Sequence, residues 1–417
     1  MMTISSHFIF FGWKVVAASL VIATFTFGVG YYGPPVFLEV LHQQRGWPVS
    51  LVSSAITVHF LVSAVLVTGL PAAHHRFGIA LITMIGIAVL AVGMLGWSVA
   101  FVPWQLFVAA AISGAGWAAT NGPAVIAMVS PWFDRRRAAA LGVALNGTSA
   151  GGILFAPLWI ALITAIGFAP GVALVGIVMC AVLGPLIWRY LRPTPASLGL
   201  APDGADPASY TLHPVQTHHF ARKLTELFSS FAFTTLSASF ALGMFAQVGA
   251  LAHLVTRLAP IMGAADAAAA LSLTTASAIV GRTLLGTLLG EADRRIVAAA
   301  TLVVQACGLM LLAVGTAPAM IVSGCVLFGL GVGNLLTLLP LIAQREFPPE
   351  TVFRVVALVS GVNQVLFAFA PGMLGILREV SGSYLVPFLT AAMVQILAAF
   401  LIILGRRLRS ASELSQG

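Results

Sequence analysis

Long apolar segments alternate with short polar ones along almost the whole chain. Each apolar segment has about twenty residues, the length at which an α-helix crosses the hydrocarbon core of a bilayer. The alternation of single polar and apolar residues that marks membrane-spanning strands is not found. The pattern therefore predicts an all-α membrane protein with twelve spans, at residues 12–38, 50–72, 79–101, 105–129, 138–165, 169–191, 227–256, 267–290, 296–316, 319–343, 352–377 and 383–405.

The longest polar stretch follows the sixth span and divides the chain. Residues 192–226 are rich in Pro, His, Asp and Ser, a composition typical of flexible connectors. We expect an N-terminal six-helix bundle over residues 1–191, a cytoplasmic connector over 192–226, and a C-terminal bundle with a cytoplasmic tail over 227–417. His213, His218 and His219 in the connector match no metal-ligand spacing, so neither a metal nor a cofactor is expected.

Composition and charge exclude two other classes of protein. Hydrophobic residues make up 59% of the 417 positions and charged residues 8%, which is far from the composition of a water-soluble globule. The net charge of +8 is concentrated in alternate polar loops and near the termini, so it indicates membrane topology and not nucleic-acid binding. We expect a monomeric, multi-pass protein of the cytoplasmic (inner) membrane, in contact with lipid, with both termini in the cytoplasm.

The two predicted halves share weak sequence similarities. The fourth span contains GAGWAATNGP and the tenth GLGVGNLLTLLP, while the fifth and eleventh spans each contain Ala-Pro near their ends. Similar halves with a site at their interface are typical of secondary transporters. The sequence has no Walker-type phosphate loop and no nucleophile–base pair, so an enzyme is not expected.

Three segments carry a resemblance to a known family. They are PWFDRRRAAALGVALNGTSAGGILFAPL at 131–158, GWKVVAASL at 12–20 and GRTLLGTLLG at 281–290. Over nearly its whole length the chain resembles the major facilitator superfamily, and within it the monocarboxylate-transporter and oxalate–formate-exchanger branch. The resemblance implies twelve helices in two bundles that work by alternating access. It also places Arg282 where the eighth helix of that branch holds a substrate carboxylate.

The loops that regulate conformation in this family are only partly matched. The loop after the second span reads PAAHHRFG and keeps Arg76 and Gly78, but it has His75 where the family has Asp. The resemblance also assigns Arg135, Arg136, Asp293 and Arg294 to such loops. Ala278 and Tyr32 stand where animal monocarboxylate carriers have an acidic residue and a lysine, so their proton mechanism does not carry over.

Arg282 is the main candidate for binding substrate, because its span contains no carboxylate. A guanidinium at the centre of a span costs about 2.5–3.5 kcal/mol to insert and usually marks a substrate or ion pathway. Its planar fork suits a carboxylate or a phosphate. The alternative is an arginine near a helix end that reaches the lipid headgroups, since Gly290 follows only eight residues later.

Other polar residues inside the spans are weaker candidates. The predicted substrate-binding set also contains Tyr31, Tyr32, Asn121, Asn146, Gln247, Asn334, Asn363 and Gln364. Each amide could instead link neighbouring helices, and the tyrosines could anchor the interface. His59 is the candidate for proton coupling, and its alternative is a neutral imidazole bonded to a neighbouring helix. His253 and Arg257 are interpreted as interfacial residues, and Gly147, Gly151 and Gly152 predict close helix packing.

The sequence thus favours a secondary carrier of a small organic anion, most simply a monocarboxylate. Arg282 would hold the carboxylate, and either a proton or a second anion could travel with it. The first alternative is a carrier of the same fold for an uncharged or larger compound, such as a drug. A membrane sensor that does not transport is a third possibility, disfavoured because no soluble signalling domain is recognisable.

Overall fold

A computed structural model of the chain describes residues 10–204, 230–290 and 292–414. Within these ranges the regular structure is helical, in agreement with the predicted all-α membrane class. The first part of the chain forms α1 (Phe11–Gly30), α2 (Gly33–Arg45), α3 (Val49–Val67), α4 (Leu70–Phe77), α5 (Ile79–Val99), α6 (Pro103–Ala118), α7 (Gly122–Val129), η1 (Ser130–Trp132), α8 (Arg137–Ile166), α9 (Phe168–Tyr190), η2 (Ala196–Leu198) and η3 (Pro202–Gly204).

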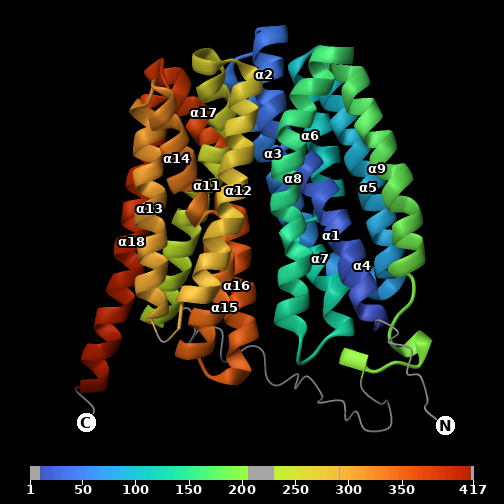
Figure 1. The fold of residues 1–417 in the computed structure, drawn as a ribbon, viewed down its shortest axis with the longest axis vertical. Helices are drawn as coiled ribbons and strands as arrows, with labels where there is room; N and C mark the ends of the chain where they lie inside the picture. Colours follow the sequence, from blue (N-terminus) through green and yellow to red (C-terminus); the bar gives the residue numbers. More distant parts are fainter. Residues whose placement is uncertain (1–9, 205–229, 291, 415–417) are drawn as a thin grey trace, which may run out of the picture.

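The second part of the chain repeats this arrangement of long and broken helices. It forms α11 (Phe231–Met262), α12 (Ala264–Leu288), α13 (Arg294–Val314), α14 (Pro318–Gly331), α15 (Asn334–Glu346), α16 (Pro349–Ala368), α17 (Ala370–Ser381) and α18 (Leu385–Leu414). Figure 1 shows α1–α9, in blue to green, on one side of the molecule and α11–α18, in yellow to red, on the other.

Eleven helical segments of the described chain are long and apolar enough to cross a membrane. The remaining predicted span, the fourth (105–129), corresponds to α6 and α7, which are too short individually because the helix breaks around Asn121. Similar breaks separate α1 from α2 and α14 from α15. The last break lies at Gly333, whose φ of +83° is a left-handed conformation that glycine adopts without steric strain.

The helices define two ends of the molecule. α1 begins and α18 ends at the same end, which we call the inner end, and α2 and α17 lie at the opposite, outer end (Figure 1). The halves touch through α2 and α11 and through α3 and α17, and along their length through α8 and α12. Nearer the middle of the molecule, the Gly372 amide at the start of α17 donates a hydrogen bond of 3.0 Å to Thr57 Oγ1 of α3. The halves are therefore joined at the outer end.

Close packing inside the N-terminal half depends on glycines of α8. A Cβ atom on Gly147 would lie 2.2 Å from the Leu20 carbonyl oxygen of α1, and one on Gly151 would lie 2.6 Å from the Thr24 carbonyl oxygen. Real side chains do not fit at such distances. The prediction that these glycines allow close helix packing is confirmed. Gly152 faces the C-terminal half instead, where a Cβ would meet Thr275.

Candidate functional site

Arg282 lies on α12, half-buried, and its guanidinium reaches across to the other half of the molecule. Its Nη2 donates a hydrogen bond to Ser149 Oγ on α8. Its Nε is buried and has no hydrogen-bond partner. The ion pairs found among the described residues involve other arginines, so no described carboxylate neutralises Arg282. Because the side chain is directed at the opposite half, the geometry does not favour the headgroup alternative.

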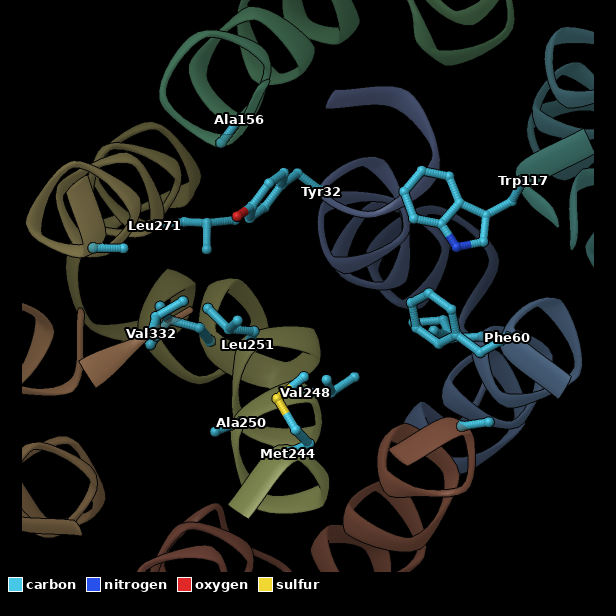
Figure 2. Packing of buried hydrophobic residues seen from close by; sticks show 14 of the residues in the cluster. Tyr32, Phe60, Trp117, Ala156, Met244, Val248, Ala250, Leu251, Leu271 and Val332 are labelled. Carbon is cyan, nitrogen blue, oxygen red and sulfur yellow. The ribbon is translucent and has the colours of Figure 1, made fainter. Parts of the chain in front are cut away.

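Tyr32 is an aromatic neighbour of the Arg282 guanidinium. It is 5% exposed, lies at the break between α1 and α2, and interacts electrostatically with Arg282. A Cβ atom on Gly152 would lie 2.7 Å from Tyr32 Cζ, so α8 approaches the ring closely. Figure 2 shows the Tyr32 hydroxyl directed at Leu271 of α12. Tyr32 and Arg282 thus lie on the two sides of one interface.

An aromatic cluster continues from Tyr32 along the N-terminal half. The ring of Tyr31 lies 5.0 Å from Tyr32, 5.8 Å from Phe60 and 6.3 Å from Trp117, measured between centroids. Phe60 is in turn 5.9 Å from Phe367 of the C-terminal half. A space of about 10 Å³ between these rings and α11 is lined by Tyr31, Tyr32, Pro35, Ile56, Phe60, Val248, Leu251 and Ala252. Figure 2 shows Phe60, Trp117 and Leu251 around this region.

The predicted amides divide into buried and exposed groups. Asn121, Gln247, Asn334 and Asn363 are each at most 5% exposed, and each keeps one amide oxygen without a hydrogen-bond partner. Two of them lie at helix breaks and make hydrogen bonds there. Asn121 Nδ2 donates to Ser63 Oγ at 3.2 Å, and Asn334 Nδ2 donates to the Leu330 carbonyl at 2.9 Å. Gln364 is half-buried. Asn146 is exposed on α8 and belongs to none of these contacts.

His59 is fully buried and belongs to a hydrogen-bonded group between α3, α5 and α6. Ser113 Oγ lies 2.8 Å from His59 Nδ1, accepts from Trp97 Nε1 at 3.1 Å, and donates to the Ala110 carbonyl at 3.0 Å. The one Ser113 proton has two possible acceptors, the Ala110 carbonyl and His59 Nδ1, so the direction of the bond between Ser113 and His59 follows the imidazole tautomer. His59 Nε2 is buried without a hydrogen-bond partner. The contacts fit the alternative of a neutral imidazole bonded to a neighbouring helix, and proton coupling by His59 stays a prediction.

The interpretation of His253 as an interfacial residue is wrong. It is fully buried, with Nε2 2.8 Å from the Pro371 carbonyl and Nδ1 3.3 Å from the Tyr384 hydroxyl. Because a carbonyl only accepts, Nε2 donates to Pro371 and Nδ1 accepts from Tyr384. Arg257 is half-buried and donates to the carbonyls of Ala313 and Gly315. His253 thus joins helices inside the C-terminal half, whereas the interfacial interpretation of Arg257 stays a prediction.

The inner loops of the N-terminal half are held by a carboxylate of the connector. Asp203 accepts from the backbone amides of Asp134, Arg135 and Arg136 at 3.0, 2.7 and 3.3 Å. Partial burial of Asp203 disfavours its charged form, but these backbone donors outweigh it and lower the pKa of the carboxyl below its usual value. Arg76 lies exposed over the Phe77 ring, and Gly78 has φ +82°. The connector histidines and residues 205–229 lie outside the described residues.

The corresponding loop of the C-terminal half contains an ion pair that the sequence did not predict. Asp293 caps α13 and pairs with Arg406, while Arg294 donates to backbone carbonyls of its own loop. The neighbouring Arg295 is 2% exposed and makes a two-bond contact with Glu346, at 2.7 and 2.8 Å. The available signal was a pair of opposite charges at the inner ends of the ninth and tenth spans.

A larger cavity lies away from this interface. It has a volume of about 360 Å³ and is lined at the inner end by residues that include His74, Trp132, Trp188 and Arg192. Partial burial lowers the pKa of His74 below its usual value. Neither Arg282 nor Tyr32 lines this cavity, so it is separate from the candidate site at the interface between the halves.

Comparison with known proteins now identifies the family. The model of the Major Facilitator Superfamily matches residues 20–371 of the chain. The chain belongs to the Major Facilitator Superfamily. It is 36% identical over 76 residues to an uncharacterized transporter of this superfamily type, YcxA of Bacillus subtilis (strain 168), a match that covers 18% of this chain and 19% of that relative.

Two solved structures are similar over nearly the full chain. A bacterial homolog of the human lysosomal transporter Spinster, in an inward-facing, unoccupied conformation, has a TM-score of 0.74 and 13% identity, covering 95% of this chain and 97% of the other. The nucleoside transporter NupG has a TM-score of 0.72 and 11% identity, covering 95% and 98%. At these identities the likeness concerns the fold. The protein is a multi-pass membrane protein of a transporter family.

Proposed function

We propose that this protein is a secondary transporter of a small organic anion of the monocarboxylate class. The observation that carries the proposal is the state of Arg282. Its guanidinium is half-buried at the interface between the halves, one of its nitrogens has no partner, and its hydrogen bond goes to an uncharged hydroxyl. A buried cation without a counterion is costly, and an anionic substrate removes that cost.

The contacts of Arg282 suggest how binding would be linked to movement of the halves. In the described state Arg282 of α12 bonds to Ser149 of α8, so the two halves share this contact. A substrate carboxylate would take the place of the Ser149 hydroxyl with stronger, charge-assisted hydrogen bonds. Tyr32, which already interacts with Arg282, would close the pocket from the N-terminal half. Exchange of these partners fits alternating access, in which each half holds the substrate in turn.

The charge distribution supports an orientation for this carrier. Arg135 and Arg136 precede α8 and Arg294 and Arg295 begin α13, both at the inner end, whereas the few arginines at the outer end include Arg257 near the end of α11 and Arg378 near the end of α17. Positive loops remain preferentially in the cytoplasm. We therefore propose that the inner end faces the cytoplasm and that the protein lies in the cytoplasmic membrane.

The first experiment identifies a substrate and then tests Arg282. Purified protein is screened by thermal shift against formate, acetate, lactate, oxalate, sugars, nucleosides and cationic drugs, and the best labelled compound is used for counterflow in liposomes. Two charge-assisted hydrogen bonds contribute about 3 kcal/mol, so Arg282→Gln is expected to reduce counterflow about 100-fold. Arg282→Lys should recover only part of it, because an ammonium lacks the planar fork.

A matched control and a contrary result make this test decisive. Arg189→Gln removes an exposed arginine of α9, and it should leave counterflow unchanged. If Arg282→Gln transports the selected compound as well as the unchanged protein does, Arg282 does not anchor the substrate.

A second candidate, a carrier of an uncharged or larger compound, is favoured by the aromatic cluster. Tyr31, Phe60 and Trp117 offer ring faces next to the interface, and the buried amides offer unpartnered polar atoms. Such a site would bind a planar, neutral molecule by stacking and hydrogen bonds. The screen would then select a nucleoside or a drug over every carboxylate, and transport would depend on Trp117 more than on Arg282.

A further inference from the structure

Glu39 is a carboxyl group buried at the outer contact between the halves. It lies on α2, in the outer part of the first span, and is 4% exposed. Its Oε1 accepts a hydrogen bond of 3.0 Å from Gln43 Nε2, while its Oε2 is buried without a partner. Glu39 does not belong to the site around Arg282. A buried carboxylate oxygen without a donor is energetically unfavourable, so the group needs a partner or a proton.

The groups around Glu39 come mainly from the opposite half. Thr256 of α11 interacts with the carboxyl, and its own Oγ1 is buried without a hydrogen-bond partner. Arg378 of α17 and His42 of α2 act on it electrostatically, but the ion pairs of the described residues do not include Glu39. Tyr384, which precedes α18, interacts with Glu39, Arg257 and Arg378, and its hydroxyl donates to His253. Two unpartnered oxygens, one from each half, thus face the same contact.

We propose that Glu39 binds a proton when the outer ends are joined and releases it when they separate, which makes it the proton-binding residue of the outer gate. In the joined state a proton on Glu39 removes the buried charge and allows a hydrogen bond with Thr256. When the halves separate, water reaches the carboxyl and solvates its charged form. Binding of a proton by one state only shifts the equilibrium toward that state. The inference rests on the alternating-access part of the proposed function.

The direction of the pH effect distinguishes this proposal from a fixed ion pair. If a proton stabilises the joined state, the outer gate opens more often as the pH rises. If charged Glu39 were instead held in the joined state by Arg378, the gate would open more often as the pH falls. Arg378 has an unpartnered Nε of its own, which shows that it is not saturated by Glu39 in the described state.

A cysteine reporter measures gate opening without a known substrate. Ser53 of α3 is fully buried in the outer contact, where a Cβ on Gly375 of α17 would meet its side chain. In a protein whose three cysteines are replaced, Ser53→Cys reacts with a water-soluble maleimide only after the halves separate. The rate is normalised to that of an exposed reporter, Thr68→Cys, which corrects for the pH dependence of the thiol reaction. We expect the normalised rate to increase about tenfold from pH 5 to pH 8, a shift of about 1.4 kcal/mol in the gate equilibrium.

Variants of Glu39 then assign the effect to this carboxyl. Glu39→Gln mimics the protonated form, so its labelling should be slow and independent of pH, whereas Glu39→Asp should keep a pH dependence. Glu379→Gln removes an exposed carboxylate of α17 at the same end and should behave like the unchanged protein. The proposal is overturned if labelling of the unchanged protein is independent of pH or slows as the pH rises. It is also overturned if Glu39→Gln keeps the full pH dependence.

The same experiment separates this inference from the proposed substrate. Arg282→Gln should lose counterflow and keep the pH-dependent labelling, Glu39→Gln should lose the pH dependence of labelling, and Glu379→Gln should keep both. If Arg282→Gln loses counterflow but the labelling of Ser53→Cys does not depend on pH, the role of Glu39 is contradicted and the anion site is supported. If Arg282→Gln keeps counterflow and the labelling of Ser53→Cys depends on pH, only the anion site is contradicted.

Discussion

Two arginines on consecutive helices show how differently the same side chain can be used. Arg295 of α13 makes five hydrogen bonds, two to Glu346 and one each to Thr235 Oγ1 and the carbonyls of Ile402 and Ala232. These equal the five N–H donors of a guanidinium. Arg282 of α12 bonds to Ser149 and keeps Nε unpartnered.

The difference indicates which arginine is structural and which is available to a ligand. Arg295 has no donor left, and its partners come from α11, α15 and α18, so it ties the inner end of the C-terminal half together. Arg282 faces the other half of the molecule and has capacity for an anion. Arg257 and Arg378 also have an Nε without a partner, so it is the unused hydrogen-bonding capacity of Arg282 together with its contact across the two halves that makes it the candidate for a ligand.

The largest effect is expected when Arg295 is replaced. Arg295→Gln leaves Glu346 buried without its counterion, and losing one member of such a pair costs about 3–5 kcal/mol. We expect a clear fall in the thermal unfolding temperature in detergent. Replacing both members, as Arg295→Met with Glu346→Leu, should recover most of the stability. Arg282→Gln should change stability by less than about 1 kcal/mol, and an equal loss at both arginines would contradict the distinction.

His59 offers a smaller test, because its hydrogen bond to Ser113 is a structural contact of the same kind as those of Arg295. His59→Asn removes the ring and should cost about 1–2 kcal/mol, the contribution of a buried hydrogen bond and some packing. Counterflow is expected to fall no more than a few-fold, with an unchanged pH profile. If transport by His59→Asn no longer responds to a pH gradient while its stability is preserved, His59 is the proton-coupling residue.

The smallest effect is expected at Asp203 of the connector, whose carboxylate accepts hydrogen bonds from the loop before α8. Its lowered pKa means that its contribution is present above the usual value of 3.8 and is lost as the pH falls through the lower folded value. Hydrogen exchange of the Arg135 and Arg136 amides should therefore lose protection below about pH 4. In Asp203→Asn, whose side chain tolerates the φ of +59° at this position, protection should be weaker at pH 7 and nearly independent of pH.

Hydrophobic patterning alone was enough to recover the arrangement of the spans. The breaks at Asn121 and Gly333 follow glycine and proline signals in the fourth and tenth spans, although the patterning gave each span as continuous. The close packing of Gly147 and Gly151 was also predictable, because small residues spaced four apart lie on one helix face. The hydrogen bonding of His253 was not, since its partners Pro371 and Tyr384 lie more than one hundred residues away.

The sequence by itself determined that Arg282 lies in an apolar stretch, 267–290, that contains no carboxylate, because helix length and hydrophobicity are local properties. Tertiary structure decided which charges found partners. Arg295 meets Glu346 across 51 positions and Arg282 meets Ser149 across 133, and Glu39 is buried on α2, which packs against α11. Electrostatic energies depend on distance and desolvation in space, and neither quantity can be read from neighbouring residues along the chain.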